Sequence, residues 1–326
     1  MSVAADRFEP EKGQAPIRGH VRSVGHDRVS HGLFLPTMEG EDEEHLWHRF
    51  LHAWQQVLPE SGAFTHVTGA RLYRWPLPNL PEQVPVFAAV NRDDPRPRRE
   101  GLVCSRLTRK SSTRMVDGFP VEEPEEVLLR AARDLGVLDL VPMIDHALRC
   151  GDLTEGPMTM ILDSGRPGVG VLRAAWELSC AKRESAMESL FGVFHAAMEI
   201  PVEPQVDLYD DQGTFIGRAD FLVIGTNRIH EYDGADHREK LQHRKDLRRE
   251  RGQTSSAYVR KGFTLDDLLN HPAVVMHEMD RDLGRPHRNR RLRRWRILVR
   301  ESLYDEVGRA RLLNRWRRAM GVVQWS

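Results

Sequence analysis

Apolar residues recur at helical spacing in three stretches of this chain. Residues 43–58 carry one apolar stripe, which predicts an amphipathic helix that packs on a core. Residues 121–154 predict two helices, the first beginning at Pro124 and the second ending at Gly151. Residues 167–199 predict a longer helical stretch.

Short apolar runs bounded by turn residues predict strands in other parts of the chain. We expect one strand at residues 31–36, and two or three strands joined by proline-rich loops within residues 62–103. Residues 204–237 contain two turn signals between runs that are rich in strand-forming residues. This segment predicts a three-stranded meander, with strands at 205–209, 214–223 and 228–233.

The second turn of the meander fixes the register of its hairpin. If Gly225 and Thr226 form a two-residue loop, Asp220 lies directly opposite Glu231 on the neighbouring strand. Asp233 lies two residues beyond Glu231 and therefore on the same face. Because three carboxylates on one face repel each other, the pattern indicates a compensating positive charge.

A divalent cation is one source of that charge, because Mg²⁺ and Mn²⁺ bind through carboxylates, water and phosphate oxygens. Such an ion activates water and stabilises the charge that develops on a phosphodiester. The alternative is a solvated polar face on which Arg218 and Arg228 neutralise the acids. The residues by themselves leave both interpretations open.

The composition is that of a globular protein, but the charge is unevenly distributed. Apolar residues make up 40% and charged residues 29%, and Lys plus Arg and Asp plus Glu each number 48. Residues 281–318 nevertheless hold 14 Arg, no Lys and four acids, interleaved with Trp295 and Trp316. Arginine binds phosphates and tryptophan stacks on bases, so this segment predicts a nucleic-acid-binding surface. The arginines expected to contact phosphates there are Arg290, Arg291, Arg293 and Arg294.

Two features argue against the membrane and secreted classes. No apolar run has the length of a membrane-spanning helix, and the first residues lack the apolar core of a signal peptide. The three cysteines form no Cys-x-x-Cys pair and give an odd count, so neither a zinc knuckle nor a disulfide framework is expected. We therefore expect a cytoplasmic protein without a membrane partner.

Other motifs are less informative. His48 and His52 have the i,i+4 spacing of a metal-ligating pair, but no zinc-protease glutamate lies between them. We interpret them as solvated surface histidines. The glycine-containing segment 165–170 lacks a Walker lysine, so a phosphate loop is not expected there.

Residues 180–280 resemble the restriction-endonuclease-like PD-(D/E)xK superfamily and, within it, the Vsr-like (very-short-patch-repair-like) domains. The resemblance rests on an Arg-x-Asp-Phe strand, a Glu-x-Asp-Gly strand, a following His, a basic helix and a final strand with an arginine. A glutamate on the preceding helix belongs to the same pattern. The residues that carry the resemblance are Glu188, Arg218, Asp220, Phe221, Glu231, Asp233, Gly234, His237, Arg244, Asp246, Arg248 and Arg260.

The resemblance implies a role for each of these polar residues. Asp220, Glu231 and Glu188 would bind the metal ion. The supporting roles would belong to Asp233 as an assisting acid, to His237 or Lys245 at the attacking water or leaving group, and to Arg244, Arg248 and Arg260 at phosphates.

The implied fold class is α/β, with a restriction-endonuclease-like mixed sheet flanked by helices and an α+β domain before it. The segment before this sheet weakly resembles the core of type IV abortive-infection antitoxin-like (AbiEi-like) proteins, although residues 1–30 are too short for the winged helix of those proteins. The expected organisation is an irregular arm at 1–30, an α+β domain at 31–175, a nuclease domain at 176–284 and an arginine-rich extension at 285–326.

We therefore expect an endonuclease that uses Mg²⁺ or Mn²⁺ to hydrolyse DNA, in defence or repair. RNA as the substrate and a homodimer as the assembly are left open. The superfamily's usual Glu-x-Lys is replaced here by Glu231 and Asp233 in a Glu-x-Asp pattern. This departure supports a rival hypothesis, a catalytically degenerate DNA-binding regulator of the antitoxin kind. A third hypothesis is a scaffold whose arginines dock an acidic protein.

Overall fold

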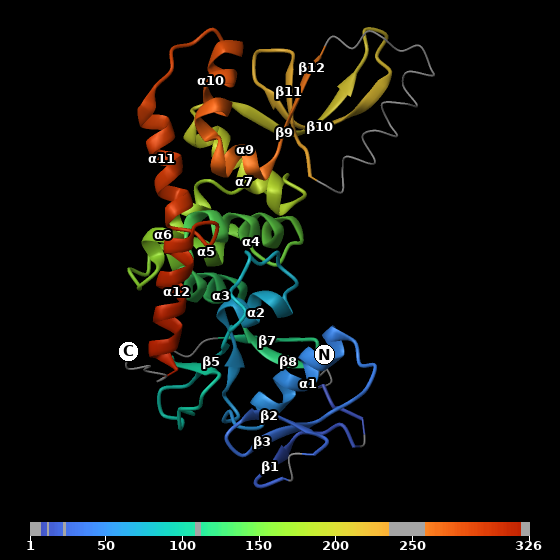
Figure 1. The fold of residues 1–326 in the computed structure, drawn as a ribbon, viewed down its shortest axis with the longest axis vertical. Coiled ribbons are helices and arrows are strands. Elements are labelled where there is room, and N and C mark those ends of the chain that lie inside the picture. The colour runs from blue at the N-terminus through green and yellow to red at the C-terminus, as the bar shows by residue number, and fades with distance from the viewer. Residues whose placement is uncertain (1–7, 12, 22–23, 108–111, 235–257, 321–326) are drawn as a thin grey trace. The chain divides into compact units, whose positions relative to one another are not determined.

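The protein is a mixed α/β chain whose residues divide into two compact units (Figure 1). The computed structural model describes residues 8–11, 13–21, 24–107, 112–234 and 258–320. Unit 1 comprises residues 1–135, 155–172 and 307–326, and unit 2 comprises residues 136–154 and 173–306.

This division differs from the four consecutive segments expected from the sequence. Residues 136–154 were expected in the N-terminal domain, but they pack with unit 2. The arginine-rich extension also divides, because residues 285–306 belong to unit 2 and residues 307–326 to unit 1. Each unit is therefore built from segments that are not consecutive in the sequence, and composition along the chain does not predict such an arrangement.

Unit 1 contains two sheets. The first is antiparallel and holds β1 (Ile17–Arg18), β3 (Leu33–Pro36) and β2 (His26–Ser30) in that order. The second is mixed and holds β6 (Leu102–Arg106), β5 (Val86–Val90), β4 (Ala63–Phe64), β8 (Phe119–Glu122) and β7 (Thr113–Val116) in that order. Because β1 and β2 lie within residues 1–30, the expectation of an irregular arm is wrong for that part of the segment.

Most helices of unit 1 carry an acid in their first turn, which favours the start of a helix. Asp42 caps the first helix by accepting a hydrogen bond from the His45 backbone N–H at 2.8 Å. The helices are α1 (Glu43–Gln55), α2 (His66–Leu72), α3 (Pro124–Ala131), α5 (Glu155–Leu162) and α12 (Glu306–Ala319), which begins at the edge of unit 2. The predicted helix at 43–58 is confirmed, and Leu51 and Trp54 of its apolar stripe are fully buried.

Unit 2 is built around one four-stranded sheet. It holds β12 (Val259–Phe263), β11 (Arg228–Tyr232), β10 (Phe215–Val223) and β9 (Val202–Tyr209) in that order. The pairs β9–β10 and β10–β11 are antiparallel, whereas β12 runs parallel to β11. The predicted meander is therefore confirmed, and the Val259–Phe263 segment that was expected to form a final strand does so.

Unit 2 also holds the helices α4 (Val137–Arg149), α7 (Ala186–Ala197), α9 (Leu265–Asn270), α10 (Pro272–Asp282) and α11 (Asn289–Arg300). Of these, α7 packs on β9 and β11, and α4, α9 and α11 pack on α7. Phe191 of α7 lies 5.4 Å from the ring of Phe221 on β10 and 5.4 Å from the ring of Phe263 on β12. Since neighbours along a strand point to opposite faces, Asp220 faces away from this aromatic core.

The long helical stretch expected at residues 167–199 is interrupted. The structure has α6 (Val169–Trp176) and then α7, with residues 177–185 between them outside any helix. Ser185 ends the interruption because its hydroxyl accepts from the Glu188 backbone N–H at 3.1 Å. This N-cap fixes where α7 begins and, with it, the position of Glu188.

Two histidines are buried between α7 and the sheet. His195 lies 2.8 Å (Nδ1) from the Phe191 carbonyl oxygen and 2.9 Å (Nε2) from His230 Nδ1. A carbonyl only accepts, so His195 Nδ1 carries the proton and His195 Nε2 accepts from His230. Burial lowers the pKa of both rings, with the neighbouring His230 adding to the effect at His195, and the pKa of His230 falls to about 4.

This pair predicts a loss of stability in mild acid. Both rings stay neutral in the folded protein, while unfolded histidines take up protons below about pH 6.5. The free energy of unfolding should therefore be fully retained above pH 6.5 and fall between pH 6.5 and 4, by up to about 1.4 kcal/mol per pH unit for each ring. Urea denaturation at pH 7 and pH 5 measures the change. The same comparison on His230→Phe should show a smaller decline, and an equal decline would assign the effect to other groups.

Candidate functional site

The register of the β10–β11 hairpin places two acids opposite each other. Phe221 pairs with His230 and Leu222 with Ile229, and the same register continued by one residue along both strands sets Asp220 opposite Glu231. This is the register predicted from the sequence. The loop itself is longer than predicted, because residues 224–227 separate the strands. Gly225 adopts a positive φ of 78° within that loop, which explains why glycine occurs there.

The row of paired positions continues across all four strands of the unit 2 sheet. Ala219 pairs with Val206 and Phe221 with Pro204, so Gln205 on β9 lies opposite Asp220. On the other side, Glu231 pairs with Gly262 on β12. The row is therefore Gln205, Asp220, Glu231 and Gly262. Sequence reasoning identified its two central residues and missed the two outer ones.

Glu231 has a positively charged partner on the parallel strand. Arg260 Nη1 lies 2.5 Å from Glu231 Oε1, and both side chains are partly buried. The resemblance assigned Arg260 to a phosphate, whereas the structure pairs it with Glu231. Arg218 and Arg228, expected to neutralise these acids in the alternative interpretation, instead contact Asp207 at 2.7 Å and Asp282 at 3.4 Å.

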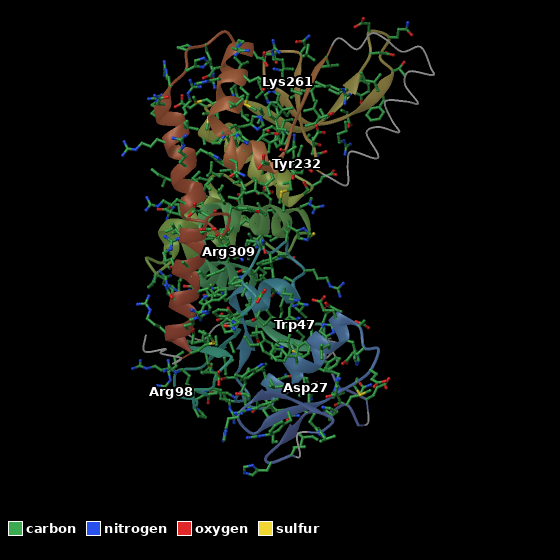
Figure 2. All side chains as sticks on the ribbon, viewed as in Figure 1. Asp27, Trp47, Arg98, Tyr232, Lys261 and Arg309 are labelled. Carbon is green, nitrogen blue, oxygen red and sulfur yellow. The ribbon has the colours of Figure 1, made fainter. Side chains whose placement is uncertain are left out.

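Asp220 and Asp233 are held by the backbone around them. Asp220 Oδ2 accepts a hydrogen bond from the Tyr232 backbone N–H at 2.8 Å. The Asp233 carboxylate lies over Gly262, where a Cβ atom would sit 1.8 Å from Asp233 Oδ2. Gly262 thus leaves the space that this carboxylate fills. Figure 2 marks the neighbouring residues Tyr232 on β11 and Lys261 on β12.

Glu188 reaches the same row from α7. Its Oε2 accepts from Gln205 Nε2 at 2.7 Å and from the Glu184 backbone N–H at 2.9 Å, and its side chain is buried. Gln205 has a positive φ of 55° within β9, an uncommon conformation for a residue with a side chain. The predicted acid on the helix is therefore linked by one hydrogen bond to the strand position opposite Asp220.

These four carboxylates do not converge on one point. Among the described residues, Glu44, His48 and Asp117 are the one group of three or more metal-ligand side chains whose ligand atoms all lie within 4.8 Å of one another. The reason is local, since Glu231 turns to Arg260, Asp220 to the Tyr232 amide, Asp233 to Gly262 and Glu188 to Gln205.

The Glu44, His48 and Asp117 group lies in unit 1, on α1 and on the β7–β8 turn. His48 Nε2 is 3.6 Å from Glu44 Oε1 and 3.9 Å from Asp117 Oδ2, and Arg74 Nη2 is 3.3 Å from that same Asp117 oxygen. The His48 side chain is only 15% exposed, which corrects its interpretation as a solvated surface histidine. Because Arg74 already neutralises Asp117, the group does not require a cation.

Part of the arginine-rich segment is structural. Arg291 is buried and donates to Asp280 Oδ1 at 2.7 Å, so it does not present its guanidinium to a ligand. Trp295 and Trp316 are each 1% exposed, which removes them as stacking surfaces for bases. The segment predicted to bind nucleic acid therefore keeps Arg290, Arg293 and Arg294 at the surface, with Arg290 paired to Glu199 at 2.9 Å.

Four predicted site residues lie outside the described part of the chain. They are His237, Arg244, Lys245 and Arg248.

No family model matches this chain, and no curated protein or solved structure matches it either. The described helices include none that is long and apolar enough to cross a membrane. The functional interpretation consequently depends on the residues of the site.

The donor chemistry of the row suits a hard divalent cation. Directly opposed residues of an antiparallel pair have Cβ atoms about 4.5–5.5 Å apart, so Asp220 and Glu231 are the residues that would hold such an ion. Carboxylate oxygens are the ligands that Mg²⁺ and Mn²⁺ prefer. An ion at this position would compete with Arg260 for Glu231, because both neutralise the same carboxylate.

Proposed function

We propose that this protein is a Mg²⁺- or Mn²⁺-dependent endonuclease that hydrolyses phosphodiester bonds of DNA. The observation that carries the proposal is the register that sets Asp220 opposite Glu231. Like charges placed directly opposite each other destabilise a sheet. We therefore infer that Asp220 and Glu231 are kept in these positions because they bind a ligand.

In this proposal some residues of the site would bind the ion and others would position the groups around it. Asp220 and Glu231 would hold the ion, which when bound activates water and stabilises charge on the phosphate. Asp233 would accept hydrogen bonds from the ion's water molecules, and Glu188 would position Gln205 beside Asp220. Arg260, once displaced from Glu231, would be free to bind a phosphate oxygen as the resemblance implies.

The order of elements in unit 2 supports the resemblance to restriction-endonuclease-like proteins. A helix that carries a glutamate precedes three antiparallel strands, and a fourth strand with an arginine then adds parallel to the third. The Asp and Glu of the pattern come from the second and third strands, as the resemblance requires. We infer the family relationship from this order together with the residues, and cleavage is its test.

The test is incubation of the purified protein with supercoiled plasmid, single-stranded DNA and RNA, each with EDTA, Mg²⁺ or Mn²⁺. Nicked or linear plasmid that appears only with the metal supports the proposal and identifies the substrate. Titration calorimetry with Mn²⁺ supplies a second readout that does not depend on the substrate chosen. Absence of both Mn²⁺ binding and cleavage would contradict the proposal.

The Glu231–Arg260 ion pair favours a second candidate function. A carboxylate that is neutralised by arginine needs no metal, as expected of a DNA-binding regulator that has lost turnover. This candidate predicts DNA binding in EDTA that weakens steeply with salt, with a logarithmic slope of about −0.9 for each phosphate contacted. Fluorescence anisotropy across a salt series distinguishes it from the enzyme.

Gly262→Ala tests whether the position of Asp233 matters. The new Cβ would overlap Asp233 Oδ2 and force that carboxylate away from Gly262, while the backbone of Gly262 suits any residue because its φ is not positive. We expect metal-dependent cleavage to fall about 10- to 100-fold, as for loss of a residue that supports metal ligands. The thermal midpoint should change little.

Gly170→Ala is the matched control, because a Cβ at Gly170 meets nothing within 4 Å. Unchanged cleavage in Gly262→Ala would show that Asp233 acts elsewhere or not at all.

A further inference from the structure

Unit 1 contains a pocket whose charges have no use in the proposed hydrolysis. Its volume is about 610 Å³, within the range of about 300–1,000 Å³ that is typical of small-molecule sites. The lining comes from the loop before β6, from β6 itself, from the segment that follows α3 and from the end of α12. Residues that are distant in the sequence thus meet at one concave site.

Six of the residues that line this pocket are arginines, and none is an acid. They are Arg96, Arg98, Arg99, Arg106, Arg133 and Arg318. Figure 2 marks Arg98 on the loop between β5 and β6. Five of the six are exposed and Arg99 is half-buried, so their mutual repulsion is weakened by solvent, but together they make the cavity strongly positive and favourable for an anion.

The pocket arginines lack paired acids among the described residues. Arg99 and Arg133 donate only to backbone carbonyls, those of His31 and Pro167, in the bonds that the structure shows for them. Among the described residues, no ion pair with an acid is formed by Arg96, Arg98 or Arg106. Arginines of unit 2 such as Arg218 and Arg228 do form ion pairs with acids. The hydrogen-bond donors of Arg96, Arg98 and Arg106 are therefore available to a ligand.

The floor of the pocket adds donors without adding negative charge. β6 is the edge strand of its sheet, so one side of its backbone has no neighbouring strand among the described residues, and all five of its residues line the pocket. Cys104 lies on this strand, and burial raises the pKa of its thiol to about 11, which keeps it neutral. Burial and the neighbouring Arg130 and Arg166 also lower the pKa of Arg133, as expected where positive charge is crowded.

We propose that this pocket binds a small ligand with several phosphate groups, of the class of nucleoside triphosphates. A guanidinium group can donate two parallel hydrogen bonds to the oxygens of one phosphate. Six arginines therefore suit a ligand with about four negative charges. The apolar lining residues Pro97, Leu102 and Met320 offer a surface for the uncharged part of such a ligand. A volume of about 610 Å³ is that of a small-molecule site, so it can enclose a nucleotide but not a DNA duplex, which favours a small molecule over DNA.

The test measures binding of ATP, GTP and inorganic triphosphate to the full chain by titration calorimetry at 150 mM salt. We expect binding of all three, much weaker binding of AMP, and at least about tenfold loss of affinity in Arg106→Ala and in Arg96→Ala, because each removes charged hydrogen bonds. Arg106→Lys keeps the charge but loses the fork, and should fall between wild type and Arg106→Ala.

Arg28→Ala is the matched control, because Arg28 is an exposed arginine of unit 1 outside the pocket. Equal affinities in wild type and Arg106→Ala would overturn the proposal, as would the absence of triphosphate binding. If Arg106→Ala instead weakened binding of single-stranded DNA while triphosphate failed to bind, the pocket would belong to a nucleic-acid surface. None of these results depends on whether the chain cleaves DNA.

Discussion

Asp220→Asn should abolish metal-dependent cleavage while leaving the fold intact. The asparagine side-chain oxygen can still accept the hydrogen bond from the Tyr232 backbone N–H, so the substitution removes the charge and little else. If the ion contributes several kcal/mol to the transition state, its loss lowers the rate by about 10³-fold or more. Single-turnover cleavage of plasmid measures the rate, and Mn²⁺ calorimetry measures the lost affinity.

Stability provides an independent check on the same variant. Because Asp220 and Glu231 repel each other across the hairpin, the metal-free Asn variant should unfold at an equal or slightly higher urea concentration. Asp207→Asn is the matched control, since Asp207 lies on the neighbouring strand and its exposed carboxylate contacts Arg218. Cleavage that persists in Asp220→Asn would locate the active site elsewhere.

Asp280→Ala should destabilise unit 2 more than any surface substitution. Asp280 is fully buried and accepts from Arg285 at 2.6 Å, Arg291 at 2.7 Å and His287 at 3.1 Å. Burial alone would raise the pKa of Asp280, but these three hydrogen bonds outweigh it and hold the pKa below its usual range. Removing the carboxylate leaves the buried Arg291 without the acid to which it donates, and with only the Glu199 carboxylate at 4.0 Å, a change that costs about 3–5 kcal/mol.

Urea denaturation monitored by tryptophan fluorescence measures this loss, with Trp295 as a buried probe in the same helix as Arg291. Glu203→Ala is the control, because it removes the exposed pair with Lys182 in the same unit, and such pairs contribute about 0–1 kcal/mol. A loss below about 1 kcal/mol in Asp280→Ala would mean that the Met198 and Pro286 carbonyls suffice to satisfy Arg291.

Local signals in the sequence predicted the sheet that carries the candidate site. Turn residues bound the strands of the meander, and strict alternation along a strand then fixes which residues oppose each other. The Asp220–Glu231 register could therefore be predicted from the sequence alone. The predicted register is correct although the predicted loop length is not. A four-residue connection at 224–227 gives the same pairing as a two-residue turn centred at the same point.

Contacts between distant segments could not be predicted in this way. The partner of Glu231 comes from β12, and the choice between a phosphate and a carboxylate as the partner of Arg260 depends on how β12 pairs with β11. Gly262 carries no chemical signal in the sequence, although its missing side chain makes room for Asp233.

The arginine-rich segment shows the same limit. Its composition indicates a charged surface, but composition does not tell an exposed arginine from one that a buried acid such as Asp280 draws inward. Trp295 is buried and its indole N–H donates to the Leu268 carbonyl at 2.8 Å, a contact that the pattern of α11 alone could not predict.

The parallel pairing of β12 with β11 also sets the order in which the carboxylate face can assemble during folding. β10 and β11 meet across a short loop, whereas β12 returns only after residues 233–258, and closing a longer loop costs more entropy. We therefore expect Asp220 and Glu231 to meet before Arg260 arrives to neutralise Glu231. An early hairpin of this kind would carry uncompensated charge, so the ions in the surrounding solution should act on the rate at which unit 2 folds as well as on what the folded site does.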